Sequence, residues 1–155
     1  MPIYIKFDGI DGEVVQQDHK GEILLDSWSW GIHQSIAAGG GGGGAGKASF
    51  SDLSVMCSSS KASPVLALRC ASGQHIKDAH LTMTKRVRGR EETYLTIELK
   101  DVLISSFQPS SDGASSAGET ISLNYEKIKY TQFSREADGS VKTTVFTWDL
   151  KRNTP

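Results

Sequence analysis

The chain has 155 residues, a length that suits one domain, so residues 1–155 are expected to fold as a single unit. Its formal net charge of −1 argues against nucleic acid and against an anionic membrane surface as partners. No segment approaches the ~18 apolar residues of a membrane span, and the N-terminus lacks the apolar run of a signal peptide. We therefore expect synthesis in the cytoplasm without a signal peptide and no stable membrane insertion.

The first half of the chain predicts strands. Residues 3–8 alternate between apolar and polar side chains, as in a half-buried strand. A longer strand is predicted over residues 22–36. One of its faces carries Leu24, Asp26, Trp28, Trp30 and Ile32, and the other carries Leu25, Ser27, Ser29, Gly31 and His33. Because indoles bury large areas, the tryptophan face should lie in the core and the small serine face should meet water or a partner.

The remaining elements complete a β-rich pattern. A strand over residues 48–57, with a bulge expected near Asp52, precedes one short helix, about Pro64–Ala71. Ser63 is its N-cap candidate, Pro64 suits its first position and Gly73 can end it. Strands over 75–84, 93–104, 121–133 and 141–150 follow, with a parity shift near 101, a polar loop over 108–118 and a hairpin turn at 137–140. The last strand places Trp148 in the core, and the pattern favours an antiparallel barrel or sandwich.

Six consecutive glycines, residues 39–44, allow two interpretations. They form either a phosphate-binding loop or a loop that contacts another protein. Residues 41–47 match the P-loop pattern as far as Lys47. Ala48 lacks the hydroxyl that would bind magnesium, and the residues after it predict a strand instead of the required helix. The contact loop is therefore the better interpretation.

No catalytic or metal-binding constellation emerges from the other residues. His19, His33, His75 and His80 lack the spacing of a metal site. Cys57 and Cys70 are predicted to be buried thiols, with a disulfide or a reactive thiol as the alternative. The sequence thus predicts no enzyme, no cofactor and no metal. The basic turn of Lys85, Arg86, Arg88 and Arg90 is either a solvated hairpin tip or a contact with an acidic patch on a neighbouring subunit.

An ordered set of segments resembles one family, that of the haemolysin-coregulated protein (Hcp), the tube protein of bacterial type VI secretion systems. The set comprises IKFDGIDGE and HKGEI near the N-terminus, SWSWG at 27–31, GGGGAGK at 41–47, SFSDLS, KASP, SGQHIKDAHLT, YLTIELKDVLISSFQP, ETISLNYEKI and the terminal FTWDL. The resemblance covers nearly the whole chain. It departs from the family pattern in the turn KRVRGR, which is more basic.

This resemblance implies a β-barrel of two sheets with one short flanking α-helix, and a homohexameric ring that stacks into a tube. It also implies partners: a valine-glycine repeat spike protein, effector cargo in the channel and contractile sheath proteins that drive secretion into the medium or a target cell. Because the chain stops at Pro155, just past the last predicted strand, no C-terminal toxin extension is expected.

The resemblance assigns an expected role to each of these sequence features. Ser27, Ser29, Gly31 and His33 are expected to face the lumen. Ring stacking or subunit contact is assigned to Gly39, Gly40, Gly41, Gly42, Gly43, Gly44, Ala45, Gly46 and Lys47, and the basic turn to a ring edge. Two other hypotheses stay open at this point: a monomeric β-sandwich that binds glycan or peptide on exposed tryptophans, and a nucleotide-dependent enzyme.

Overall fold

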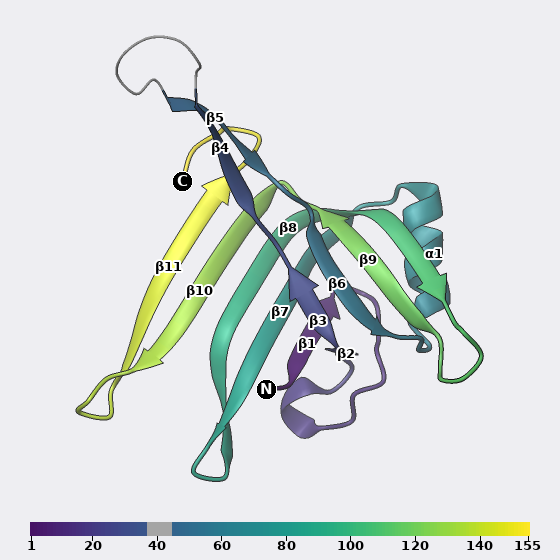
Figure 1. The fold of residues 1–155 in the computed structure, drawn as a ribbon, viewed down its shortest axis with the longest axis horizontal. Coiled ribbons are helices and arrows are strands. Elements are labelled where there is room, and N and C mark those ends of the chain that lie inside the picture. The colour runs from purple at the N-terminus through teal and green to yellow at the C-terminus, as the bar shows by residue number, and fades with distance from the viewer. Residues whose placement is uncertain (37–44) are drawn as a thin grey trace.

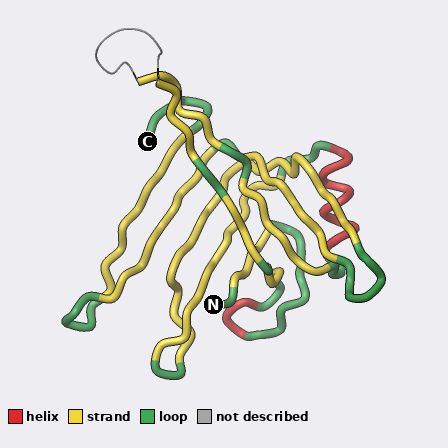
Figure 2. The backbone as a smooth tube through the Cα atoms, viewed as in Figure 1, coloured by secondary structure: helices red, strands yellow, loops and turns green. Residues whose placement is uncertain are grey.

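Strands dominate the computed structural model, which describes residues 1–36 and 45–155 (Figure 1, Figure 2). Its elements are β1 (Ile3–Phe7), the 3-10 helix η1 (Gln17–His19), β2 (Ile23–Leu25), β3 (Ser27–Ser29), β4 (Ile32–Ile36), β5 (Ala45–Phe50), β6 (Leu53–Ser58), α1 (Ser63–Ser72), β7 (Ile76–Val87), β8 (Arg90–Ser110), β9 (Gly118–Asn124), β10 (Lys127–Arg135) and β11 (Val141–Asp149). The predicted fold class, mostly β with one short α-helix, is confirmed.

The long strand β8 organises the main sheet, whose path in the described residues is β2-β1-β7-β8-β9-β6-β3. Residues 95–100 of β8 pair with β10, which carries β11 on its far edge, whereas residues 103–110 pair with β9. Asp101 lies between these two parts with a φ of 55°. The predicted parity shift near residue 101 is therefore a kink in one continuous strand.

The sheet curls back on itself, but its hydrogen-bond ladder is not closed. Its path ends at β2 and β3, which follow each other directly in the chain. Strand β2 pairs with β1, and β3 pairs with β6. The amide of Asp26, between them, donates to the Met56 carbonyl at 2.7 Å. The chain itself thus closes the barrel where a ladder is lacking.

The prediction of one strand over residues 22–36 was wrong, because Asp26 interrupts the alternation. Before it, Leu25 is 5% exposed and Leu24 55% exposed, the reverse of the prediction. After it, Trp28 and Trp30 pack against the core, whereas Ile32 is 42% exposed. One residue outside the strands shifts the parity, and a shift by one position moves every later side chain to the other face.

Two further predicted strands are also divided. A bulge was expected near Asp52, but the predicted strand is interrupted at Ser51 and Asp52. Before this break, residues 45–50 form β5, which pairs with β4 in the β4–β5 hairpin. After it, residues 53–58 form β6 in the main sheet. Residues 125–126 separate β9 from β10. The polar loop predicted from residue 108 begins later, since β8 continues to Ser110.

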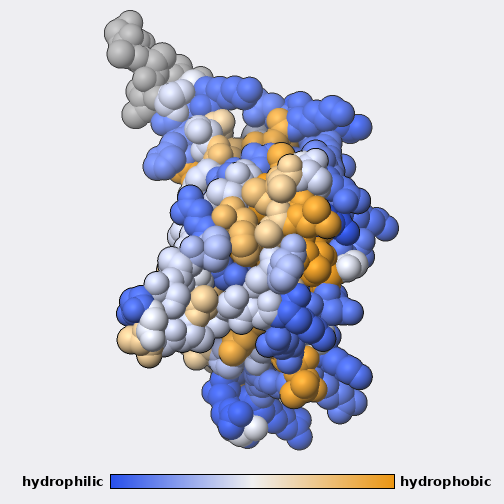
Figure 3. Space-filling view, turned by 90° about the vertical axis from the view of Figure 1, so that its right-hand side faces the viewer, coloured by the Kyte–Doolittle hydropathy of each residue, from blue (hydrophilic) through white to orange (hydrophobic). Residues whose placement is uncertain are grey.

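Helix α1 ends as predicted but begins differently. Gly73 adopts the left-handed conformation, with a φ of 67°, and its amide bonds to the Cys70 carbonyl. The N-cap position falls on Ala62, not on Ser63. The Ser63 hydroxyl instead donates to the buried Glu119 carboxylate at 2.8 Å. The helix side of the molecule shows apolar side chains among polar ones (Figure 3), and Leu68 of α1 is 63% exposed there.

Candidate functional site

Four neighbouring strands present small hydroxyl side chains on the outer face of the barrel. The ladders of β3, β6, β9 and the second half of β8 align one row of Ser29, Ser54, Ser122 and Ser106. The next row contains Ser27, Met56, Thr120 and Gln108. We call these eight residues the hydroxyl face. None of them carries an ionisable group, so the surface they form is neutral, and it is hydrogen-bonding except at Met56, which is 49% exposed.

The inner side of the same strands fixes which residues form this face. Between the two rows lies a third row of Trp28, Val55, Ile121 and Phe107. Val55 and Ile121 are at most 1% exposed, and the two aromatic residues pack against the core. A slip of one residue in any ladder would bury hydroxyls and expose this apolar row, so the register is strongly determined.

The other half of the barrel has a different outer surface. Strands β1, β7, β8 and β10 align Lys6, His80, Glu98 and Lys129 in one row. Ion pairs join Lys129 to Glu98 at 3.9 Å and Lys100 to Asp78 at 3.6 Å. The molecule therefore has one charged sheet surface and one neutral surface, and these two suit different partners.

Of the four residues predicted to face the lumen, the structure brings only two together on one surface. Ser27 and Ser29 lie exposed on the hydroxyl face. Gly31 lies between β3 and β4, and His33 is exposed on β4, which pairs only with β5 in the described residues. Sequence reasoning missed the partners of the two serines on β6, β8 and β9. Their signal was present in the alternating segments LSVMCS (53–58) and TISLN (120–124).

The tryptophans are not a ligand platform. Trp28, Trp30 and Trp148 are half-buried and pack against the core. Trp30 stacks on Tyr130 with ring centroids 5.8 Å apart, and its Nε1 donates to the Tyr125 hydroxyl at 2.6 Å. A glycan- or peptide-binding module of the kind considered above needs these rings exposed. Their packing argues against that alternative.

The glycine residues 39–44 lie outside the described residues, so their role in ring contact stays a prediction. The three residues that follow, Ala45, Gly46 and Lys47, begin strand β5. A strand at this position cannot supply the helix N-terminus that a phosphate loop requires. A Cβ on Gly46 would lie 2.0 Å from the Ser35 Oγ, so the close pairing of β4 and β5 requires glycine here.

The two cysteines are free thiols in different surroundings. Cys57 is 1% exposed, whereas Cys70 is half-buried. Burial, followed by the nearby carboxylate of Glu119, raises the pKa of the Cys57 thiol to about 12. The buried-thiol prediction therefore holds for Cys57 and only in part for Cys70.

This difference predicts selective reactivity. At pH 8, a maleimide should modify Cys70 in the folded protein and leave Cys57 intact until urea is added, as read by mass spectrometry of peptides. Because the folded-state pKa is raised, the stabilising effect of the neutral Cys57 thiol is complete below an ordinary thiol pKa of about 8.5 and is lost as the pH rises towards 12. The free energy of unfolding should fall less steeply in this range for Cys57→Ala. Equal labelling of both thiols in the folded protein would contradict the prediction.

Comparisons with known proteins identify the class. Residues 4–132 match the family model described as "Type VI secretion system effector, Hcp". The chain is 35% identical to protein hcp1 of Pseudomonas aeruginosa, over 97% of this chain and 96% of that protein. Its structure resembles Hcp1 of Salmonella typhimurium with a TM-score of 0.80 and 32% identity, covering 99% and 96% of the two chains. A type six secretion system protein gives a TM-score of 0.90 with 26% identity, covering 99% and 98%.

These matches place the chain among the secreted tube proteins of the type VI secretion system. It belongs to the Hcp family. Proteins of this family are structural, so the chain is not an enzyme. None of the helices in the described ranges is long and apolar enough to cross a membrane.

Proposed function

We propose that the chain assembles into six-membered rings that stack into the inner tube of the secretion system, with the hydroxyl face turned to the channel. The observation that carries this proposal is the pair of uncharged rows across β3, β6, β9 and β8. Serine and threonine hydroxyls exchange hydrogen bonds with water and with cargo at little net gain, because each protein bond replaces a water bond. Such a wall lets cargo pass without holding it.

The rings then act with partners that the resemblance implies. Effector proteins occupy the channel, a spike protein of the valine-glycine repeat type closes the tip, and a contractile sheath surrounds the tube. The ion-pair rows of β1, β7, β8 and β10 suit an outward position, since alternating charges on a sheet surface are well solvated. The glycine tract is assigned to contacts between subunits or rings.

Native mass spectrometry tests the ring directly. We expect complexes of six subunits of 16.8 kDa each, and six-fold rings in negative-stain images. Monomers or dimers alone at every concentration would refute the proposal.

The direction of the hydroxyl face needs a second measurement. In a Cys70→Ser background, Ser29→Cys labelled with a maleimide-gold cluster should place the gold at the centre of each ring. The matched control, His80→Cys on the charged surface, should place it away from the centre. Central gold for the control and peripheral gold for Ser29→Cys would reverse the assignment while leaving the ring intact.

A further inference from the structure

A polar pocket of about 460 Å³ lies on the charged half of the barrel, between the η1 segment and the outer face of the sheet. Residues of η1, β7 and β8 line it, together with Glu22 and with Phe133 of β10. The His19 ring of η1 stacks on the Tyr4 ring of β1, with centroids 3.9 Å apart, and so holds this segment against the sheet. The hydroxyl face lies on the other half of the barrel, so the proposed channel wall makes no use of this pocket.

A β-bulge turns two threonines of β8 towards the pocket. The β7–β8 ladder shifts register here, which leaves one extra residue in β8. Residues 94–95 therefore both pack on the core side. Thr93 and Thr96, on either side of them, both reach the outer face, where they lie opposite Thr84 and Thr82 of β7. Bulges re-aim side chains in this way, and they are frequent beside binding sites.

One of these four hydroxyls is buried without a partner. Thr84 is 2% exposed, and its hydroxyl donates to Glu91 and to the Pro2 carbonyl. Thr96 is 9% exposed, and within residues 1–36 and 45–155 its hydroxyl has no hydrogen-bond partner. A hydroxyl withdrawn from water without a partner costs free energy. Because Thr96 lines the pocket, a donor group bound there can supply the missing bond.

Negative charge is in excess in the pocket. Its described lining contains the carboxylates of Asp18, Glu22 and Glu91, the imidazoles of His19 and His80, and no lysine or arginine. The His19 Nδ1 lies 3.1 Å from Glu22, and its Nε2 lies 4.0 Å from Glu91. Three carboxylates face two imidazoles, so one negative charge is in excess even when both imidazoles are protonated.

The Glu91 carboxylate is held in its charged form by neutral donors. Hydrogen bonds from Thr84 and then from Gln16, and a further one from Tyr4, lower its pKa. A hydroxyl, an amide and a phenol orient the carboxylate without cancelling its charge, and only His19 offsets that charge in part. The negative charge of the pocket is therefore fixed in place.

We propose that this pocket binds a primary ammonium group on a short alkyl stem, supplied by a small amine or by a lysine side chain of a partner. An ammonium group has three donors and no acceptor, which suits a lining of carboxylates and one unpartnered hydroxyl. The half-buried Phe133 ring offers an apolar contact to the stem and a π face to the charge. A metal ion fits less well, because no group of three or more His, Cys, Asp or Glu side chains in the described residues could hold one.

Saturation-transfer difference NMR on the full chain tests the charge requirement with three probes of equal stem length. Butylamine should give saturable signals from its methylene protons, whereas butanol and butyrate should bind at least about tenfold more weakly, since neither carries the positive charge. Putrescine and an acetyl-Gly-Lys-Gly amide peptide then distinguish the two sources. Tighter binding of putrescine would identify a small amine as the ligand, and tighter binding of the peptide would identify a lysine side chain.

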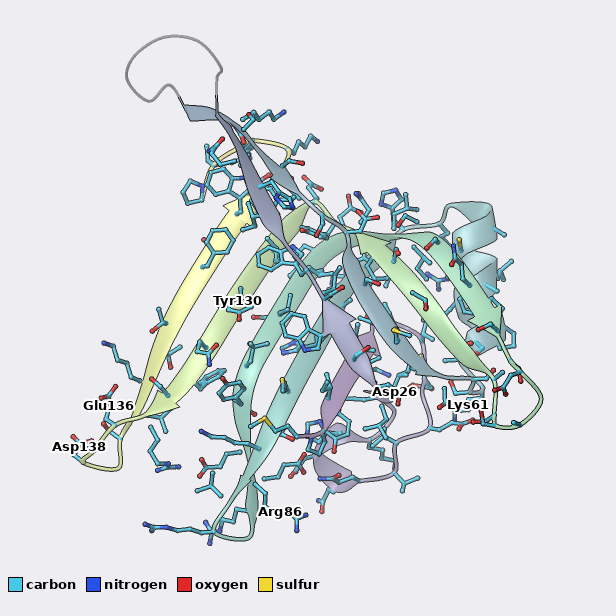
Figure 4. All side chains as sticks on the ribbon, in the orientation of Figure 1. Asp26, Lys61, Arg86, Tyr130, Glu136 and Asp138 are labelled. Carbon is cyan, nitrogen blue, oxygen red and sulfur yellow. The ribbon has the colours of Figure 1, made fainter. Side chains whose placement is uncertain are left out.

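Variants locate the binding. Glu22→Gln and Thr96→Val should each weaken butylamine binding about tenfold, because each removes one bond to the ammonium group. Thr96→Ser keeps the hydroxyl and should bind as the wild type does, which separates the bond from any effect of repacking. Glu136→Gln makes the same charge change as Glu22→Gln at the β10–β11 turn, away from the pocket (Figure 4), and should leave binding unchanged.

Three results would overturn the proposal: equal binding of butylamine and butanol, wild-type affinity in both Glu22→Gln and Thr96→Val, or the same loss in Thr96→Ser as in Thr96→Val. Melting curves confirm that each variant is folded before it is titrated. Because the pocket lies within one chain, failure of ring assembly would refute the proposed function and leave this binding site standing.

Discussion

Replacing Leu25 by alanine should lower the free energy of unfolding by about 3 kcal/mol, whereas Leu24→Ala should change it by less than about 0.5 kcal/mol. The two leucines are adjacent in β2, but Leu25 is 5% exposed and pairs with Ile3 of β1, while Leu24 is 55% exposed. Truncation of the buried leucine removes apolar contacts and leaves a cavity in the core. Truncation of the exposed Leu24 removes few apolar contacts and leaves no cavity in the core.

Urea unfolding followed by tryptophan fluorescence measures both effects. The variants and the wild type should be compared at one protein concentration, since assembly contributes to apparent stability. Equal m-values would show that only stability has changed. A larger loss for Leu24→Ala than for Leu25→Ala would mean that the face assignment of β2 is the one read from the sequence, not the one in the structure.

The two leucines show where sequence patterns stop being informative. Alternation predicted most of the residues that form strands, and it predicted the packing of Trp28 and Trp30 against the core. It could not show that Asp26 stands outside the ladders, because a single inserted position leaves no compositional signal. The same limit applies at Ser51 and Asp52, where the chain leaves the sheet to form the β4–β5 hairpin. Tertiary contacts fix the position of this break, since the Asp52 carboxylate accepts hydrogen bonds from Ser105 and Asn124.

Only part of the candidate site could be predicted from the sequence, for a related reason. Ser27 and Ser29 stood out because they alternate with tryptophans. Ser54 and Ser122 alternate with apolar residues as clearly, but nothing in one strand tells which residues of another strand lie beside it. Register between strands distant in sequence comes only from the fold.

Replacing Trp30 by alanine should cost about 3 kcal/mol and should loosen the β4–β5 hairpin from the barrel. The indole stacks on Tyr130 of β10 and lies 6.4 Å from the Phe50 ring of β5. Its Nε1 donates to the hydroxyl of Tyr125, and that hydroxyl donates in turn to the Ser51 carbonyl at 2.9 Å. One side chain thus joins the strand end of β3, the hairpin and the β10–β11 pair.

Trp30→Phe separates the stacking from the hydrogen bond. Phenylalanine keeps an aromatic ring against Tyr130, and Tyr125 still donates to Ser51, so only the indole bond is lost and the cost should be about 1 kcal/mol. Limited proteolysis should cut the β4–β5 hairpin faster in Trp30→Ala than in Trp30→Phe, at equal fractions of folded protein. If both variants were cut at the wild-type rate, Trp30 would stabilise the barrel without anchoring the hairpin. Faster cleavage in Trp30→Ala alone would show that the packing of the indole ring, more than its hydrogen bond, anchors the β4–β5 hairpin to the barrel.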